Sequence, residues 1–227
     1  MAPTLPLFPL NTVLFPGVVV PLHVFEERYR ALVRHLLAEQ EPARRLFGSV
    51  GIREGYEVGD HGAQSLYRVG CRLQLTDVAA RADGSFDIQA VGRDRFRLDR
   101  LHTQGAFPAA EITPLAADDE QDAAPSSLVA DAVREAVTQF EAYRAAVRGF
   151  REDPHPGPLP ADPTYLSWVL AAAAPLTLPE RQALLEGDLV VERLREVTRL
   201  LREELRAMQA IPSLPATEVA RTRWSPN

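Results

Sequence analysis

The sequence predicts an α+β protein: a small β-barrel or strongly coiled sheet of about six strands with one short helix, followed by an α-helical bundle. Two observations predict this order. Up to residue 115, short β-patterned segments are separated by Gly, Pro and Asp-Gly turns. After residue 125, apolar residues recur at helical spacing. We therefore expect a barrel over 1–115, an acidic linker over 116–125, a helical bundle over 126–212 and an extended tail over 213–227.

The chain opens with two strands that proline interrupts. Residues 6–10 (PLFPL) are expected to be extended, because proline fixes φ and disfavours a helical predecessor. Pro16 and Gly17 supply the central residues of a type II turn, and the valines at 18–20 favour a strand. Since proline is tolerated at strand ends and edges, we place this region at a sheet edge or at the closure of a barrel.

A helix is predicted directly after the second strand. Glu26 and Glu27 near its start, and Arg34 and His35 near its end, suit the helix dipole. We expect Glu26 to pair with Arg30 one turn later. One apolar face is predicted to consist of Phe25, Tyr29, Leu32, Val33 and Leu36.

Several β-patterned segments follow, and a hairpin is expected where Asp83-Gly84 separates two of them. In the later segment, Phe96 and Leu98 alternate with Arg95, Arg97 and Asp99. This alternation is typical of a strand with one face in water.

Four helices are expected beyond the acidic stretch. Asp162 and Pro163 begin the second, Pro179 opens the third, and Asp188 caps the fourth. Trp224 is expected to hold the tail against the body, and the alternative is an exposed contact to a partner. The apolar positions of the first helix are Val129, Val133, Val137, Phe140, Val147 and Phe150, and those of the fourth are Leu194, Val197, Leu201, Leu205 and Met208.

The charge distribution disfavours nucleic acid as a partner. Residues 1–115 carry 13 Arg and 13 acidic residues, whereas residues 116–227 carry 12 Arg and 18 acidic residues, which gives the net charge of −6. Non-specific phosphate binding needs a basic field instead. The chain has no lysine, which excludes a Walker A loop, Ser–Lys catalysis and Schiff-base chemistry.

No secretory or membrane-spanning pattern is present, and a single cysteine, Cys71, agrees with a cytoplasmic location. The five histidines have no metal-site spacing, and no nucleophile lies in a catalytic motif. We expect no metal, no cofactor and no enzymatic activity.

The opening residues carry a more specific signal. "LPLFPLNTVLFPGVVVPLHVFEERYRALV" (5–33) resembles the start of the Lon protease N-terminal domain, with its proline-rich strand, Leu-Phe-Pro-Gly turn, Pro-Leu pair and Phe-Glu-x-Arg-Tyr motif. Segments at 47–50, 69–78, 83–98 and 161–186 are similar to it too, so that the resemblance covers about residues 4–210. It assigns a structural role to Pro16, Gly17, Phe25, Glu26, Arg28 and Tyr29.

The resemblance implies a PUA-like barrel, a helical bundle and a part in selecting unfolded or damaged protein substrates. We expect a stand-alone bacterial form of this domain, without the ATPase and Ser–Lys protease that follow it in Lon. It would bind unfolded polypeptide, or act as an adaptor to a separate protease, through an apolar groove between the barrel and the helices.

The candidate lip of that groove is Phe15, Val18 and Val20, because large exposed apolar patches usually mark interaction sites. The alternative function is RNA binding, since PUA-like barrels also occur in RNA-binding proteins. That alternative requires Arg95 and Arg97 to contact phosphates. The sequence does not indicate an oligomeric state.

Overall fold

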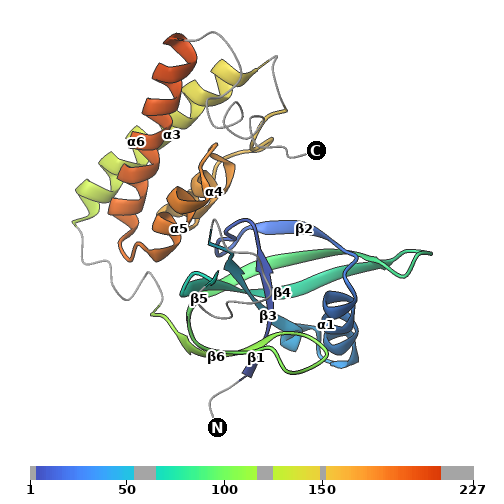
Figure 1. Cartoon of the computed structure of the whole chain (residues 1–227). Coiled ribbons are helices and arrows are strands. Elements are labelled where there is room, and N and C mark those ends of the chain that lie inside the picture. The colour runs from blue at the N-terminus through green and yellow to red at the C-terminus, as the bar shows by residue number, and fades with distance from the viewer. Residues whose placement is uncertain (1–3, 54–64, 117–124, 149–151, 211–227) are drawn as a thin grey trace. The chain divides into compact units, whose positions relative to one another are not determined.

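The computed structural model of the chain describes residues 4–53, 65–116, 125–148 and 152–210. The chain divides into two compact units, Met1–Ala117 and Asp118–Asn227. The first unit holds a six-stranded sheet and helix α1, and the second holds helices α3 to α6 (Figure 1), which confirms the α+β class. The tail at 213–227 with Trp224, and all of the acidic linker except its two end residues, lie outside the described residues. The predicted domain boundaries therefore stay predictions.

The strands pair in the order β2-β5-β4-β3-β1-β6, and β5 also pairs with β6. The pairings of β5, β4, β3, β1 and β6 therefore close into a ring, which agrees with the predicted barrel, while β2 lies on the edge of β5 outside the ring. Among the described strands, only β1 and β3 pair in parallel. The strands are β1 (Thr4–Leu10), β2 (Val19–Val24), β3 (Leu46–Gly51), β4 (Val69–Ala80), β5 (Phe86–His102) and β6 (Ala109–Pro114).

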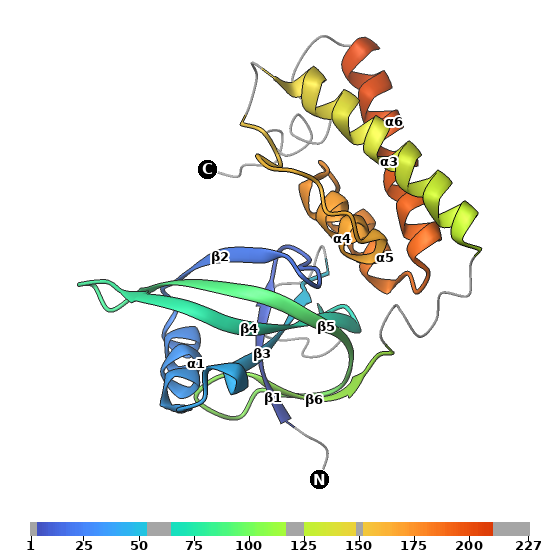
Figure 2. The same cartoon turned by 180° about the vertical axis from the view of Figure 1, so that it is seen from behind.

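The hairpin predicted at Asp83-Gly84 joins β4 to β5 and extends beyond the rest of the sheet (Figures 1 and 2). Gly84 has φ of 81° and donates its N–H to the Arg81 carbonyl over 3.0 Å. The Asp83 carboxylate accepts the backbone N–H of Ser85 over 2.9 Å. The turn thus uses the left-handed freedom of glycine and the short acceptor of aspartate, as its sequence indicates.

The prolines of β1 lie where they remove no ladder hydrogen bond. Leu7 donates its N–H toward β6, to the Pro108 carbonyl over 2.8 Å, so Pro9, two residues later, faces the same side. There the pairing with β6 covers only Thr4 to Pro6. Pro6 faces the opposite side, where the pairing with β3 begins at Leu7. β1 can therefore close the ring despite two missing N–H groups.

Helix α1 (Glu27–Ala38) begins later than the sequence predicted. Tyr29, Leu32, Val33 and Leu36 form its buried face as expected, but Phe25 precedes the helix and is exposed. The predicted pair of Glu26 with Arg30 is also wrong. Glu26 is the N-cap residue and pairs with Arg28, and Glu27 pairs with Arg30 and Arg34. Glu26 is thus engaged by Arg28, and Arg30 by Glu27, so the predicted pair does not form.

The sheet unit has two apolar clusters, one on each face of the sheet. Successive side chains of a strand point to opposite faces, so Leu7 lies in one cluster and Phe8 in the other. The cluster that includes Phe8 is covered by α1. The other is built from β1, β3, β5, β6 and Leu66, with Phe96 fully buried in it. Both faces of β1 are therefore core.

The described part of the second unit contains four helices at the predicted positions: α3 (Ser126–Val147), α4 (Pro163–Ala173), α5 (Leu178–Glu186) and α6 (Val190–Ala210). The Asp162 carboxylate caps α4 by accepting the N–H of Tyr165 over 2.7 Å. Residues 166–171 of α4 are all buried, as expected of a helix at the centre of a bundle. The buried Arg193 guanidinium of α6 stacks on the Trp168 ring at 3.4 Å and donates to the Ser167 hydroxyl over 2.8 Å.

The buried stripe of α3 differs from the predicted one. Phe140 and Val147 are buried as expected, but Val129, Val133 and Val137 are only partly buried. The core positions are instead Ala132, Ala136, Phe140, Tyr143 and Val147, and Phe150 lies outside the described residues. Small alanines let α3 approach its neighbours closely, which hydrophobicity alone did not indicate.

Candidate functional site

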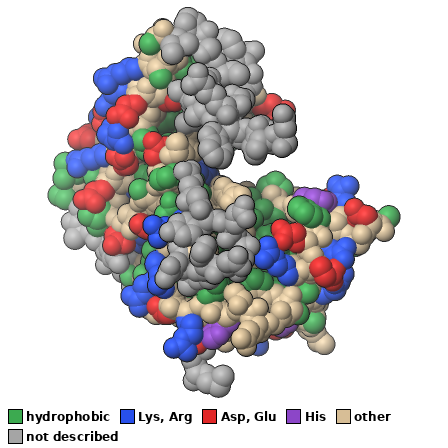
Figure 3. Space-filling view, viewed as in Figure 1, with side chains coloured by type: hydrophobic (Ala, Val, Ile, Leu, Met, Phe, Trp, Pro, Cys, Tyr) green, Lys and Arg blue, Asp and Glu red, His purple; other side chains and the backbone are tan. Residues whose placement is uncertain are grey.

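β2 presents an apolar row to solvent. Val19 is 59% exposed and Phe25, just after the strand, is 65% exposed. Pro21 and His23 lie between them at two-residue spacing and are exposed as well. The Phe25 ring stacks with the His23 ring at 6.0 Å. We call Val19, Pro21, His23 and Phe25 the outer row; hydrophobic side chains gather over β2 in Figure 3.

The opposite side of β2 belongs to the core. Val24 is buried, and Val20 and Leu22 pack against the cluster that α1 covers. The Val18 carbonyl accepts the Gly92 N–H over 3.0 Å, so the backbone groups of Val18 and of alternate residues after it face β5. Pro21 belongs to the other set and faces the free edge, where its missing N–H breaks no ladder bond.

The predicted lip is therefore corrected. Phe15 is only 1% exposed, because its ring belongs to the interior of the unit, so it cannot contact a polypeptide. Val18 and Val20 are partly buried, and binding by them stays a prediction. The exposed valine is Val19, which the sequence analysis omitted. The signal was available: Val20, Leu22 and Val24 alternate with Pro21 and His23, which assigns Val20 to the core and Val19 to the surface.

A pocket of about 330 Å³ adjoins the outer row and shares His23 and Phe25 with it. We call it the α1 pocket, since it lies at the start of that helix. Its lining combines apolar and polar side chains. The lining residues are Phe8, Pro9, Leu10, Asn11, His23, Val24, Phe25, Glu26, Arg28, Tyr29 and Ile52.

Four of the six motif residues predicted from the resemblance line this pocket: Phe25, Glu26, Arg28 and Tyr29. Tyr29 stacks on Phe8 with ring centroids 4.2 Å apart, and the Arg28 guanidinium carbon lies 4.6 Å from the Tyr29 ring centroid. Arg28 also donates to the Glu26 carboxylate over 2.9 Å. Burial raises the pKa of the Tyr29 phenol above its usual value, so the ring stays neutral at physiological pH. The pocket can therefore hold an apolar or aromatic group beside a balanced ion pair.

Charges next to the outer row are paired. His23 Nδ1 lies 2.8 Å from the Asp87 carboxylate, and Arg81 pairs with the same carboxylate. Hydrogen bonds from Arg81 and then from His23 lower the pKa of the Asp87 carboxyl. The charges of Arg81 and Asp87 offset each other, so this group adds little net charge to the apolar surface.

The arginines of β5 do not form the basic face that RNA binding requires. Arg95 is only 3% exposed and pairs with the buried Cys71 of β4, so it cannot contact a phosphate backbone. Arg97 is bonded to Asp99 at 3.0 Å, and Arg93 donates to the Gln74 side-chain oxygen over 2.9 Å. These contacts neutralise or engage the side chains that the alternative function needs.

The helical unit has a groove of its own. It measures about 530 Å³ and is lined by Ser126, Val129, Ala130, Val133, Arg134, Ala161 and Pro163. The partly buried valines of α3, Val129 and Val133, thus line a surface feature.

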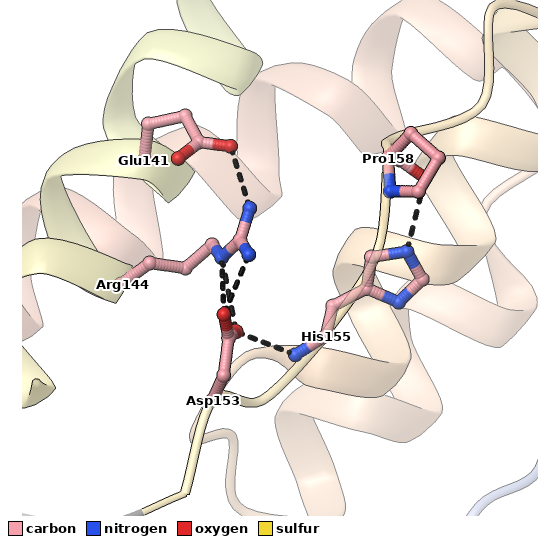
Figure 4. Close-up of polar contacts among 5 residues, drawn as sticks. All are labelled: Glu141, Arg144, Asp153, His155 and Pro158. Carbon is pink, nitrogen blue, oxygen red and sulfur yellow. Dashed lines mark hydrogen bonds and ion pairs between the residues drawn. The ribbon is translucent and has the colours of Figure 1, made fainter.

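A polar clamp holds the proline-rich connector between α3 and α4 (Figure 4). Arg144 donates to Asp153 over 2.9 Å and to Glu141 over 2.9 Å, and Asp153 accepts the backbone N–H of His155 over 3.0 Å. The hydrogen bond from Arg144 is the main cause of the lowered pKa of the Asp153 carboxyl. Because these groups are hydrogen-bonded to one another, the role of the clamp is to hold the connector against α3.

Within the described part of the chain, no group of three or more His, Cys, Asp or Glu side chains is placed to hold a metal ion. Cys71 is buried, and burial raises the pKa of its thiol, so it is not an activated nucleophile. The structure therefore brings together an apolar surface and an aromatic pocket.

The sequence model of the "ATP-dependent protease La (LON) substrate-binding domain" matches residues 4–203. The chain belongs to this family. LON-domain relatives include Lon protease 2 of Herpetosiphon aurantiacus, 30% identical over 90% of this chain and 24% of the relative, and Lon protease of Escherichia coli K12, 26% identical over 90% and 25%. The chain thus spans about a quarter of the length of the curated relatives it matches.

Two solved LON-domain structures share the fold. The Lon N-terminal domain protein from Xanthomonas campestris has 24% identity and a TM-score of 0.59, covering 87% of this chain and 98% of that one. The N-terminal domain of Mycobacterium avium complex Lon protease has 19% identity and a TM-score of 0.61, covering 88% and 98%. No helix among the residues described for this LON domain is long and apolar enough to cross a membrane.

Proposed function

We propose that this LON domain is a non-catalytic module that binds exposed apolar segments of unfolded or damaged polypeptide. The outer row of β2 makes the primary contact, and the α1 pocket takes one large apolar side chain of the bound segment. In the cytoplasm, such a module would present its clients to a separate protease.

The exposure of Val19 and Phe25 on one row is the observation that carries this proposal. Two large apolar side chains at 59% and 65% exposure, with an exposed proline between them, cover a surface that water solvates poorly. Burying each of these side chains against a partner contributes about 1.5–3 kcal/mol before the entropy of binding is subtracted.

An extended segment suits this surface better than strand addition does. The outer row repeats every second residue, as do the side chains on one face of an extended client. Pro21 leaves a donor missing in the middle of the free edge of β2, so a client strand added there would lack one main-chain hydrogen bond. We infer that the client lies across the face of the row and that side-chain contacts dominate.

Fluorescence anisotropy tests this function. The purified chain is titrated against a labelled, permanently unfolded polypeptide and against a labelled single-stranded RNA, each at low and high salt. We expect binding to the polypeptide alone, nearly independent of salt, because apolar burial is not screened. RNA binding that falls steeply with salt would contradict the proposal and support the alternative. Binding to neither would mean that the partner is a folded protein.

A further inference from the structure

We propose that Gly92 of β5 is a positioning residue that fixes the register of β2 and thereby selects the side chains of the outer row. The Phe15-Pro16-Gly17 turn docks on Gly92 and acts as a clasp. The effect on client binding rests on the proposed function, whereas the effect on side-chain exposure does not.

The N-terminal end of β2 needs such a device because the first residues of the strand specify their faces weakly. Residues 18–20 are three consecutive valines, so a one-residue shift at this end of the strand changes little in local hydrophobicity, and the alternation that distinguishes core from surface begins only with Pro21. No tight turn joins β2 to its partner, since α1, β3 and β4 intervene along the chain before β5. β2 also has only one neighbouring strand among the described residues.

Two hydrogen bonds form the clasp, one to the carbonyl of Gly92 and one from its N–H. The Gly92 carbonyl accepts the Gly17 N–H over 2.9 Å, and the Gly92 N–H donates to the Val18 carbonyl over 3.0 Å. Gly17 has φ of 75°, and Val18 donates to the Phe15 carbonyl over 3.4 Å, as in the predicted type II turn. The turn is therefore tied to one point on β5, immediately before the first residue of β2.

Only glycine permits this contact at position 92. A Cβ atom there would lie 2.1 Å from the Phe15 carbonyl oxygen and 3.0 Å from the Pro16 Cα atom, and both of these are backbone atoms. Any side chain therefore displaces the turn. With the clasp closed, Val19 pairs with Val91 and faces solvent. When the turn is displaced from Gly92, we expect Val18, Val19 and Val20 no longer to be held with one face toward the core and the other toward solvent.

Thiol labelling reports this assignment directly. Val19→Cys and Val20→Cys are made separately, with Gly92 or with Gly92→Ala, and the rate of reaction with an aromatic disulfide reagent is measured. Cys71 is an unreactive background because it is buried. With Gly92, we expect Val19→Cys to react at least about tenfold faster than Val20→Cys, and with Gly92→Ala we expect that ratio to fall severalfold. Affinity for the unfolded polypeptide falls in parallel.

Gly48→Ala is the matched control. A Cβ at position 48 would meet the Phe96 ring at 2.8 Å, so the variant stresses the core without touching β2. We expect it to keep the labelling ratio and the affinity. If Gly92→Ala does not fold, the clasp is tested with Gly17→Val and Gly17→Asn instead. Asparagine tolerates the positive φ of Gly17, whereas valine opposes it. The ratio should collapse only with valine.

An unchanged labelling ratio in Gly92→Ala, or an equal collapse in Gly48→Ala, would overturn the clasp. Failure of every variant and of the native chain to bind polypeptide would instead contradict the proposed function. The labelling ratio would still test the clasp in that case.

Discussion

β1 and β2 are both short, apolar and interrupted by proline, yet they end in opposite environments. β1 lies between β3 and β6, and Leu7 and Phe8 on its two faces are 0% and 6% exposed. β2 lies on the edge of β5, and Val19 is 59% exposed. The same local pattern therefore closes the core in one strand and forms a surface in the other.

This difference separates stability from recognition. In a strand that is buried on both faces, each apolar residue contributes mainly to packing. The exposed apolar residues of the outer row are not explained by packing, which points to a role in binding. We therefore expect substitutions in β1 to change the free energy of unfolding, and those in the outer row to change client affinity.

The largest expected effect is on stability, from Leu7→Ala in β1. Leu7 is fully buried, so the substitution removes apolar contacts and leaves a cavity, which destabilises by about 2–5 kcal/mol. Urea denaturation followed by circular dichroism measures the change. A loss below about 1 kcal/mol would mean that β1 is less tightly packed than its burial indicates.

The double variant Val19→Ser with Phe25→Ser should have the opposite effect, with a small change in stability and a large change in client affinity. Both side chains are exposed, so the stability should change by about 0.5 kcal/mol or less per site, while affinity for unfolded polypeptide falls at least about tenfold. Leu37→Ser with Leu128→Ser is the control, since these side chains are 38% and 42% exposed outside the row. Equal losses of affinity in both double variants would remove the special role of the row.

Pro21→Val tests why β2 remains an available edge. The substitution restores an N–H on the free edge and adds a β-branched side chain, so strand-to-strand association of two copies becomes more favourable. We expect concentration-dependent association in sedimentation velocity, above that of the parent chain. A sedimentation profile identical to that of the parent chain would show that Pro21 does not protect the edge.

The smallest expected effect comes from Asp87→Asn beside the outer row. Arg81 and then His23 lower the pKa of the Asp87 carboxyl in the folded chain. Its contribution to stability is therefore complete above the unfolded-state pKa of about 3.9 and is lost as the pH falls through the lower folded-state value. We expect a slightly lower urea midpoint than the parent at pH 7, and no difference near about pH 2. A difference that persists in acid would point to packing.

Much of the fold follows from local chemistry in the sequence. The Asp83-Gly84 hairpin, the Pro16-Gly17 turn and the cap at Asp162 each depend on residues that are adjacent in the chain, and all three are confirmed. The buried face of α1 follows from helical spacing in the same way. Interactions of this kind need no knowledge of distant partners.

The misplaced residues depend on distant partners. In the proposed clasp, Val18, Val19 and Val20 acquire their faces from the contact of the preceding turn with Gly92, which lies more than seventy residues later. Arg95 alternates with Phe96 as predicted, but it lies opposite the buried Cys71 of β4 and is itself buried, whereas Arg97 is exposed. On α3, buried Ala132 and Ala136 replace the larger valines because helix packing favours small residues at close approach.

The most direct test of the central claim is to map where the polypeptide lies. Single cysteines at Val19, Leu37 and Leu128, all exposed positions, are labelled with a benzophenone maleimide and irradiated with bound unfolded polypeptide. Buried Cys71 stays unlabelled. We predict strong crosslinking from position 19 and only background from positions 37 and 128. Equal or stronger crosslinking from either control position would contradict the assignment of the outer row as the client-binding surface.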